Sequence, residues 1–182
     1  GGTRIATFVI LVGGGQTGSQ LAAQLIEAGH RVHVIEERPT VVELLRKELP
    51  ADAVVTGDGS SPSVLEAAGV HEAHVLAAVT GDDDANLVVT TLARFEFNVP
   101  RVIARVNNPK NAWLFTGDMG VDVAINQADA AVLAKHFRRL AGWLPNPVAP
   151  RTRPSAARVE AARLFLRQQL GEDAPVWLLP CR

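Results

Sequence analysis

A glycine-rich turn near the N-terminus has the residue types and spacing needed to hold a diphosphate. Gly13, Gly15 and Gly18 follow an apolar run and precede a segment of helical periodicity. In such a pattern the first glycine allows a tight turn, the second lets the backbone approach a diphosphate, and the third lets helix and strand pack closely. The helix N-terminus adds unpaired N–H groups and a partial positive charge. The alternative is a plain glycine-rich turn, so the strand–turn–helix context carries the interpretation.

An acidic residue stands where a ribose-binding carboxylate is expected. Glu36 ends the second expected strand, 21 positions after Gly15. A carboxylate there can accept hydrogen bonds from both hydroxyls of an adenosine ribose. It would repel a 2′-phosphate and so disfavours NADP, although Arg38 is near enough to weaken that preference. The alternative is a solvated loop carboxylate.

Polar residues also follow three further expected strands. Asp58, in the sequence Gly57-Asp58-Gly59-Ser60, could accept from an adenine amino group, or could simply stabilise a turn. Thr80 and Gly81 end the fourth strand, and Arg105 ends the fifth. Arg105 could donate to a phosphate as a planar group, or form a structural ion pair. Because ligands of such folds bind at the carboxyl edge of the sheet, we expect these residues to share one crevice.

No metal ligand or catalytic residue is predicted. The five histidines lack zinc-binding spacing, and the three acids at 82–84 are typical of a helix start. The single cysteine, Cys181, excludes an internal disulfide framework. The net charge of −1 gives no field to attract nucleic acid, and the longest apolar stretch, 5–12, is far shorter than the roughly 20 residues that span a bilayer.

These residues must be positioned by an alternation of strands and helices. Right-handed crossovers then favour an α/β fold, a Rossmann-like doubly wound parallel six-stranded sheet of order 3-2-1-4-5-6. The expected strands are 6–12, 31–36, 53–56, 74–80, 101–106 and 121–125, and the expected helices are 17–28, 41–49, 63–68, 83–97, 111–115 and 128–140.

The composition changes after Gly142. Six of the 11 prolines lie between Pro145 and Pro180, which indicates an extended linker over 143–154. A second amphipathic helix is predicted over 155–170. We therefore expect a nucleotide-binding domain over 5–141 and a proline-rich linker, one helix and a tail over 142–182.

Taken together the motifs resemble those of RCK (KTN, TrkA-N type) domains, the cytosolic regulatory domains of potassium channels and of Trk/Ktr-type potassium-uptake systems. The resemblance covers about residues 7–140. It rests on the glycine turn with Gln16, Glu36, the sequence 57–60, Leu65–Gly69, Ala78–Thr80 with Asp83 and Asn86, and Ile103–Arg105, in that order.

The resemblance implies a regulatory, non-catalytic domain that binds NAD(H) or adenine nucleotides and gates a membrane potassium transporter or channel. The glycine turn with Gln16 and Thr17 would hold the diphosphate, Glu36 the ribose, Asp58 the adenine side, and Thr80 and Arg105 the remainder. It further implies that the domain assembles into a homodimer or larger ring. Neither a nucleic-acid partner nor direct insertion into the membrane is expected. The location would be cytoplasmic, peripheral at the inner face of the membrane through the partner.

Three departures from the family pattern refine this expectation. Some ATP-binding members carry arginine where this chain has Gln16, which favours NAD(H) over ATP. NAD(H) is therefore the foremost ligand, with ADP, ATP or AMP as alternatives. Many members have a Pro-Glu pair where Asn126-Gln127-Ala128 stands, so a cation site is not expected there. Residues 143–182 are too few for the usual second regulatory module, which we predict to be absent.

Two other classes of function are alternatives to the hypothesis of a regulatory domain. An NAD-dependent oxidoreductase is disfavoured, because the chain has no tyrosine for a Tyr/Lys proton relay and no convergent acid/base set. An interaction module that binds no nucleotide is the other alternative. Self-association is predicted through the apolar helix 128–140 and the apolar residues after it, unless that helix only covers the sixth strand.

Overall fold

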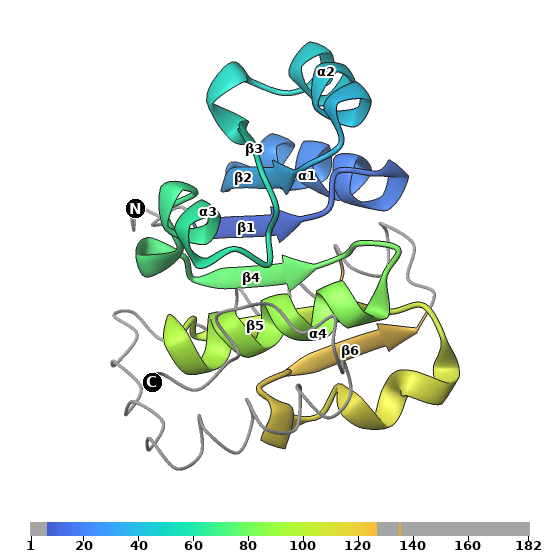
Figure 1. Ribbon diagram of the computed structural model, residues 1–182. Coiled ribbons are helices and arrows are strands. Elements are labelled where there is room, and N and C mark those ends of the chain that lie inside the picture. Colours follow the sequence, from blue (N-terminus) through green and yellow to red (C-terminus); the bar gives the residue numbers. More distant parts are fainter. Residues whose placement is uncertain (1–6, 127–134, 136–182) are drawn as a thin grey trace.

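A computed structural model of the chain describes residues 7–126 and residue 135. Within them six parallel strands form one sheet in the order β3-β2-β1-β4-β5-β6, which confirms the predicted topology (Figure 1). The predicted helix 128–140, the linker and the helix 155–170 lie outside the described residues, apart from position 135. The strands are β1 Phe8–Val12, β2 Arg31–Glu36, β3 Val54–Thr56, β4 Val75–Ala78, β5 Arg101–Val106 and β6 Val123–Asn126.

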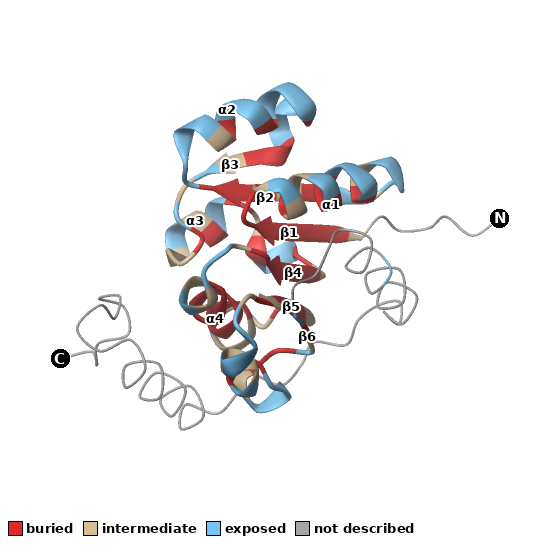
Figure 2. Cartoon of the chain, turned by 90° about the vertical axis from the view of Figure 1, so that its right-hand side faces the viewer, coloured by how far each residue is buried: buried red, intermediate tan, exposed pale blue. Residues whose placement is uncertain are grey.

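The central strand β1 divides the apolar core into two layers. All five of its residues are buried, as expected of a parallel strand covered on both faces (Figure 2). Val9 and Leu11 belong to the layer that α1 and α2 cover, whereas Phe8, Ile10 and Val12 belong to the layer that α3 and α4 cover. The helices are α1 Gln16–Glu27, α2 Pro39–Glu48, α3 Pro62–Ala67 and α4 Asp83–Thr91.

Helix α2 begins two residues earlier than predicted, and α3 begins one residue earlier. In both cases a proline, Pro39 or Pro62, opens the helix. Proline suits this position because its missing N–H would have no partner in the first turn anyway. The boundaries 41–49 and 63–68 are therefore corrected to Pro39–Glu48 and Pro62–Ala67.

The elements from α4 to β6 depart from the prediction in several places. Helix α4 ends at Thr91 and continues as a π-helical turn η3, Leu92–Glu96, so the single α-helix expected over 83–97 is wrong. The helix expected over 111–115 is a 3₁₀ segment, η4, Pro109–Leu114. Strand β6 begins at Val123 rather than at residue 121. Further short 3₁₀ turns are η1 Ala51–Ala53, η2 Val70–Glu72 and η5 Gly117–Met119.

Strand β4 ends at Ala78, not at residue 80. The N–H of Val79 still donates to the carbonyl of Val12, but the N–H of Thr80 donates to the side chain of Asn86. A side-chain amide therefore replaces the neighbouring strand as the backbone partner. The chain leaves the sheet at that point and turns into α4.

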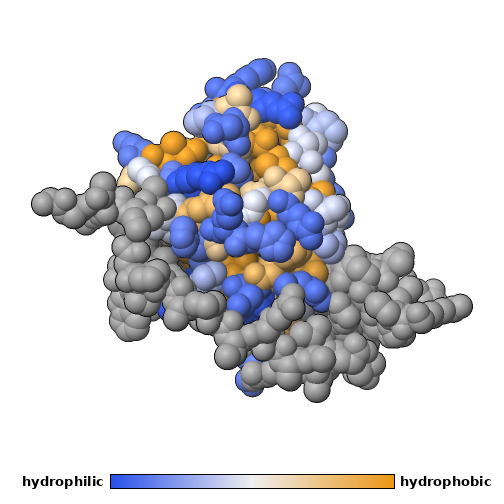
Figure 3. Space-filling view, turned by 90° about the vertical axis from the view of Figure 1, so that its left-hand side faces the viewer, coloured by the Kyte–Doolittle hydropathy of each residue, from blue (hydrophilic) through white to orange (hydrophobic). Residues whose placement is uncertain are grey.

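The surface of the described residues is mixed in character. Seen from the left-hand side of Figure 1, hydrophilic and hydrophobic residues are interspersed (Figure 3). A surface of this kind is ordinary, since apolar atoms contribute more than half of the area of most folded proteins. None of the helices in the described part combines the length and the apolar character needed to span a membrane.

Candidate functional site at the carboxyl edge of the sheet

The glycine turn joins β1 to α1 and has the local geometry that its pattern predicts. Gly13 has a φ of +108°, and its N–H donates to the carbonyl of Ile35 at 2.9 Å. A Cβ on Gly13 would lie 3.0 Å from the backbone nitrogen of Thr80, and one on Gly18 would collide with the Gly13 carbonyl. The first and third glycines are thus required by the turn and by helix–strand packing.

The second glycine leaves the start of α1 open. Gly15 is the N-cap residue, and the nearest atom to a Cβ placed on it would be a guanidinium nitrogen of Arg38, at 3.5 Å. With no side chain, Gly15 cannot cap the N–H groups of Gln16, Thr17 and Gly18. Free N–H groups at a helix start form an anion-binding site. This geometry is what the predicted diphosphate contacts of Gln16 and Thr17 require.

Glu36 is buried at the end of β2, with 5% of its surface exposed. Its Oε1 accepts the N–H of Gly14 at 3.1 Å, and its Oε2 accepts the N–H groups of Glu37 and Arg38 at 2.8 and 2.9 Å. Burial alone would raise the pKa of Glu36, but the hydrogen bonds from Arg38 and Gly14 outweigh it and lower the pKa. The side chain is an ionised carboxylate attached to the glycine turn, and not a solvated loop acid.

Arg38 contacts the same carboxylate with its side chain. Its Nη2 lies 2.7 Å from Glu36 Oε1, and its Nε lies 3.2 Å from Oε2. The Arg38 side chain is 60% exposed, whereas that of Glu36 is 4% exposed. Proximity in sequence suggested an influence of Arg38 on ribose selection, but the two-point contact with Glu36 is visible only in the structure.

Asp58 lies in the exposed turn that follows β3. Its Oδ1 accepts the N–H of Ser60 at 2.9 Å and the hydroxyl of Ser60 at 2.8 Å. The turn also abuts the predicted site, because the N–H of Gly57 donates to the carbonyl of Glu36 at 3.0 Å, and a Cβ on Gly59 would collide with Val12. The observed contacts of Asp58 are those of a turn residue, and its contact with adenine stays a prediction.

Asn86 joins the ends of β4 and β5 from the first turns of α4. The residue is fully buried. Its Oδ1 accepts the N–H and the hydroxyl of Thr80 at 3.0 and 2.6 Å, and its Nδ2 donates to the carbonyls of Thr80 and Arg105 at 3.0 and 2.9 Å. Asn86 is a positioning residue for both. The motif order included it, but nothing in the sequence indicated these four contacts.

Arg105 reaches back from β5 to the start of α1. Its Nη1 lies 3.5 Å from the hydroxyl of Thr17, and its buried Nε has no hydrogen-bond partner among residues 7–126 and 135. Among those residues it forms no salt bridge either, so a structural ion pair does not account for it there. A partly buried guanidinium with an unused donor suits an anionic ligand at the glycine turn.

Two of the three acids at the start of α4, Asp82 and Asp83, have structural partners. Asp82 caps the helix by accepting the N–H of Asp84 at 3.0 Å, as predicted for a helix start. The carboxylate of Asp83 accepts the backbone N–H groups of Asn107 and Asn108 at 2.6 and 2.9 Å. Burial would raise the pKa of Asp83, but these bonds and those from asparagine side chains outweigh it and lower the pKa. Asp83 thereby holds the segment that follows β5.

The predicted residues are brought together at one edge of the sheet. Gly13 lies against Thr80, Gly14 contacts Glu36, and Thr17 lies beside Arg105. Gly81 follows Thr80 directly and is exposed. The residues expected to bind a ligand all lie at or just after the carboxyl ends of β1 to β5, namely Gly13, Gly15, Gln16, Thr17, Gly18, Glu36, Asp58, Thr80, Gly81 and Arg105.

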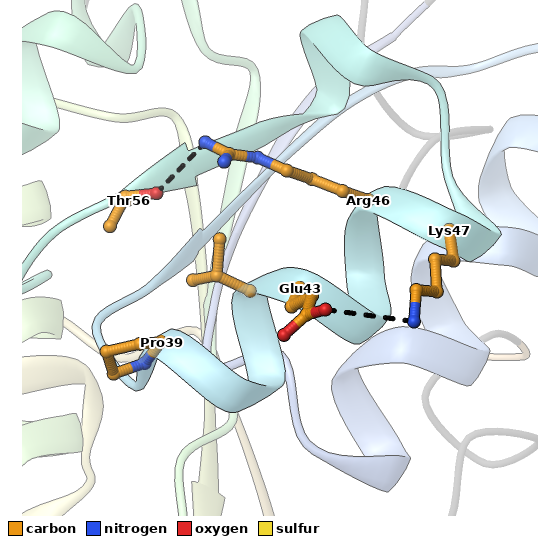
Figure 4. Close-up of a pocket in the computed structure, with 6 residues that line it drawn as sticks. Pro39, Glu43, Arg46, Lys47 and Thr56 are labelled. Carbon is orange, nitrogen blue, oxygen red and sulfur yellow. Dashed lines mark hydrogen bonds and ion pairs between the residues drawn. The ribbon is translucent and has the colours of Figure 1, made fainter.

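A separate depression of about 450 Å³ lies between α2 and β3 (Figure 4). Arg46 donates across it to the hydroxyl of Thr56 at 3.3 Å, and Lys47 pairs with Glu43 at 3.8 Å. Pro39 and Val42 complete its lining. It contains none of the residues predicted to bind a ligand, so it does not enlarge the candidate site.

The order of the strands, the glycine turn and the acid at the end of β2 define a Rossmann-like domain of the kind that carries a nucleotide site at its carboxyl edge. The chain belongs to the TrkA-N domain family, which it matches over residues 9–127. The family resemblance inferred from the motifs is therefore confirmed.

Relatives of known name support the same assignment. The chain is similar to the Trk system potassium uptake protein TrkA of Mycobacterium tuberculosis, with 41% identity over 65% of this chain and 53% of the relative. It is also similar to the TrkA homolog of Methanothermobacter thermautotrophicus, with 37% identity over 82% of this chain and 62% of the relative. The chain thus spans between about half and three fifths of these relatives.

Two solved structures of GsuK share the fold. GsuK bound to ADP superposes with a TM-score of 0.55 at 25% identity, over 74% of this chain and 34% of that one. The GsuK channel bound to NAD superposes with a TM-score of 0.57 at 24% identity, over 78% of this chain and 24% of that one.

Proposed function

We propose that this chain is a nucleotide-binding regulatory domain of a potassium-uptake system or potassium channel, with NAD(H) as the foremost ligand and ADP, ATP or AMP as alternatives. The observation that carries the proposal is the direct link between the glycine turn and the buried Glu36 carboxylate. A diphosphate at the free N–H groups of α1 and a ribose at Glu36 would then be neighbours. Arg105 adds a cation beside Thr17.

The relatives support both the ligand and the partner. Two of them are named as Trk system potassium uptake proteins, and the structurally similar GsuK was solved with ADP and with NAD. We infer that the partner is a membrane potassium transporter or channel subunit. The domain would then work as a cytoplasmic, peripheral, self-associating subunit that carries out no catalysis, with residues 5–141 as its nucleotide-binding unit.

Calorimetry with NADH, ADP and ATP tests the ligand. The expected result is saturable binding of at least one of them below millimolar concentration, lost when Gly18 is replaced by a larger residue. Absence of heat, together with absence of competition between these nucleotides, would contradict the proposal. A turnover assay with NADH and a panel of carbonyl substrates tests the oxidoreductase alternative. Measurable oxidation of NADH would support that alternative.

Light scattering at micromolar concentration tests self-association. A dimer or larger ring should exceed the monomer mass of 19.4 kDa. A monomer mass that nucleotide leaves unchanged would contradict this part of the proposal alone. The proposal that the domain binds a nucleotide would stand after such a result.

A further inference from the structure

Five hydrogen bonds converge on the Glu36 carboxylate. Three come from the backbone N–H groups of Gly14, Glu37 and Arg38, and two come from the Arg38 guanidinium. A carboxylate offers about four lone-pair positions, so this one is already saturated. Any further donor that binds Glu36 must replace one of these five.

Only the Arg38 side chain can leave without moving the backbone. The three N–H groups are held by the glycine turn and by the start of α2. The guanidinium is the tip of a long side chain that is 60% exposed, so it can turn into solvent, although the Glu36 side chain that it contacts is only 4% exposed. The guanidinium also resembles a ribose diol in one respect, since its two N–H groups reach the two different carboxylate oxygens.

We propose that the Arg38 guanidinium occupies the place of a ribose diol on Glu36, so that a 2′-hydroxyl must displace it to reach the carboxylate whereas a 2′-deoxyribose leaves it in place, and Arg38 thereby weakens the discrimination between ribose and 2′-deoxyribose. This inference rests on the proposed function, because it presumes that Glu36 receives the ribose. Arg38 is in this view a specificity-determining residue that acts by competition.

The position of Arg38 complicates a simple affinity measurement. A guanidinium nitrogen of Arg38 would lie 3.5 Å from a Cβ on Gly15, over the start of α1 where the diphosphate is expected. A displaced guanidinium therefore stays within reach of a phosphate. Removing Arg38 would free Glu36 for the diol and would also remove a cation from the diphosphate, with opposite effects on affinity.

A ratio of affinities separates these two effects. ADP and 2′-deoxy-ADP carry the same diphosphate. Contacts to phosphate therefore cancel in the ratio of the dissociation constant of 2′-deoxy-ADP to that of ADP. The ratio then reports only the contribution of the 2′-hydroxyl. It should be measured by calorimetry for the parent chain and for Arg38→Met, which keeps an unbranched side chain without the donors.

The Arg38→Met variant should raise this ratio at least about fivefold, because this factor is the upper end for fully exposed ion pairs and the Glu36 partner is buried. Arg38→Gln, whose single amide cannot span both oxygens, should give an intermediate ratio. Arg46→Met is the matched control, because Arg46 lies on α2, the helix that Arg38 immediately precedes, and contacts Thr56 instead of Glu36. It should retain the ratio of the parent, and Glu36→Gln should lower the ratio toward one.

A ratio in Arg38→Met equal to or below that of the parent would overturn the competition by Arg38 while leaving nucleotide binding intact. A rise of the same size in Arg46→Met would also overturn it, since the effect would then come from net charge. Failure of the parent chain to bind either nucleotide would overturn the proposed function itself, and this inference with it.

Discussion

Replacing Asn86 by alanine should destabilise the domain and disturb the candidate site together. The side chain is fully buried and makes four hydrogen bonds, two with groups of Thr80 that donate and two with the carbonyls of Thr80 and Arg105. A net contribution of about 1 kcal/mol for each gives an upper figure of about 4 kcal/mol. Thr80 is only partly buried and its carbonyl also accepts from Asn107, so water and that bond recover part of the loss.

The expected loss of unfolding free energy is therefore about 2–4 kcal/mol, measured by urea denaturation. A domain of this size has roughly 5–15 kcal/mol of stability, so the variant should still fold. Asn111→Ala is the matched control, because Asn111 is partly exposed and contributes one of several bonds to Asp83. It should lose less than about 1 kcal/mol.

The Asn86→Ala variant should also bind NADH more weakly, since Thr80 and Arg105 would lose the side-chain bonds that set their relative position. The Asn111→Ala control should bind NADH as the parent does. A loss of unfolding free energy below about 1 kcal/mol for Asn86→Ala would refute the reasoning, because it would show that water replaces all four bonds at no cost.

Three further outcomes follow from the geometry of the site. Gly18→Ala should cost more than about 2 kcal/mol in thermal or urea unfolding, because its Cβ would collide with a backbone carbonyl, whereas Gly81→Ala, with open space around it, should cost far less. Glu36→Ala should weaken NAD binding by about 1–3 kcal/mol in calorimetry, and unchanged affinity would disprove its role. Because the pKa of Asp83 is lowered on folding, its contribution to stability is present above its ordinary pKa and is lost as pH falls toward the lowered value. Unfolding between pH 6 and about pH 3 should accordingly be less pH-dependent in Asp83→Asn than in the parent; equal slopes would argue against the asparagine contacts.

The order of the strands, and with it the edge of the sheet at which the candidate site is proposed, could be predicted from the sequence alone. Each strand is a short apolar run bounded by glycine, proline or polar residues, and right-handed crossovers leave few ways to arrange six of them. The glycine turn could also be predicted from the sequence. The positive φ of Gly13 and the close approach of Gly18 to the Gly13 carbonyl exclude other residue types for local steric reasons. Once the strands are parallel, their carboxyl ends must meet at one edge, and Glu36, Thr80 and Arg105 are brought there together.

Only the tertiary structure decided which side chains meet at that edge. The two-point contact of Arg38 with Glu36 depends on the direction in which the chain leaves β2, and the four bonds of Asn86 depend on where α4 sits over β4 and β5. Such contacts join residues through distances and rotamers that no spacing in the sequence records. The early end of β4 has the same origin, because a buried amide from the following helix takes the backbone N–H that a longer strand would have given to its neighbour.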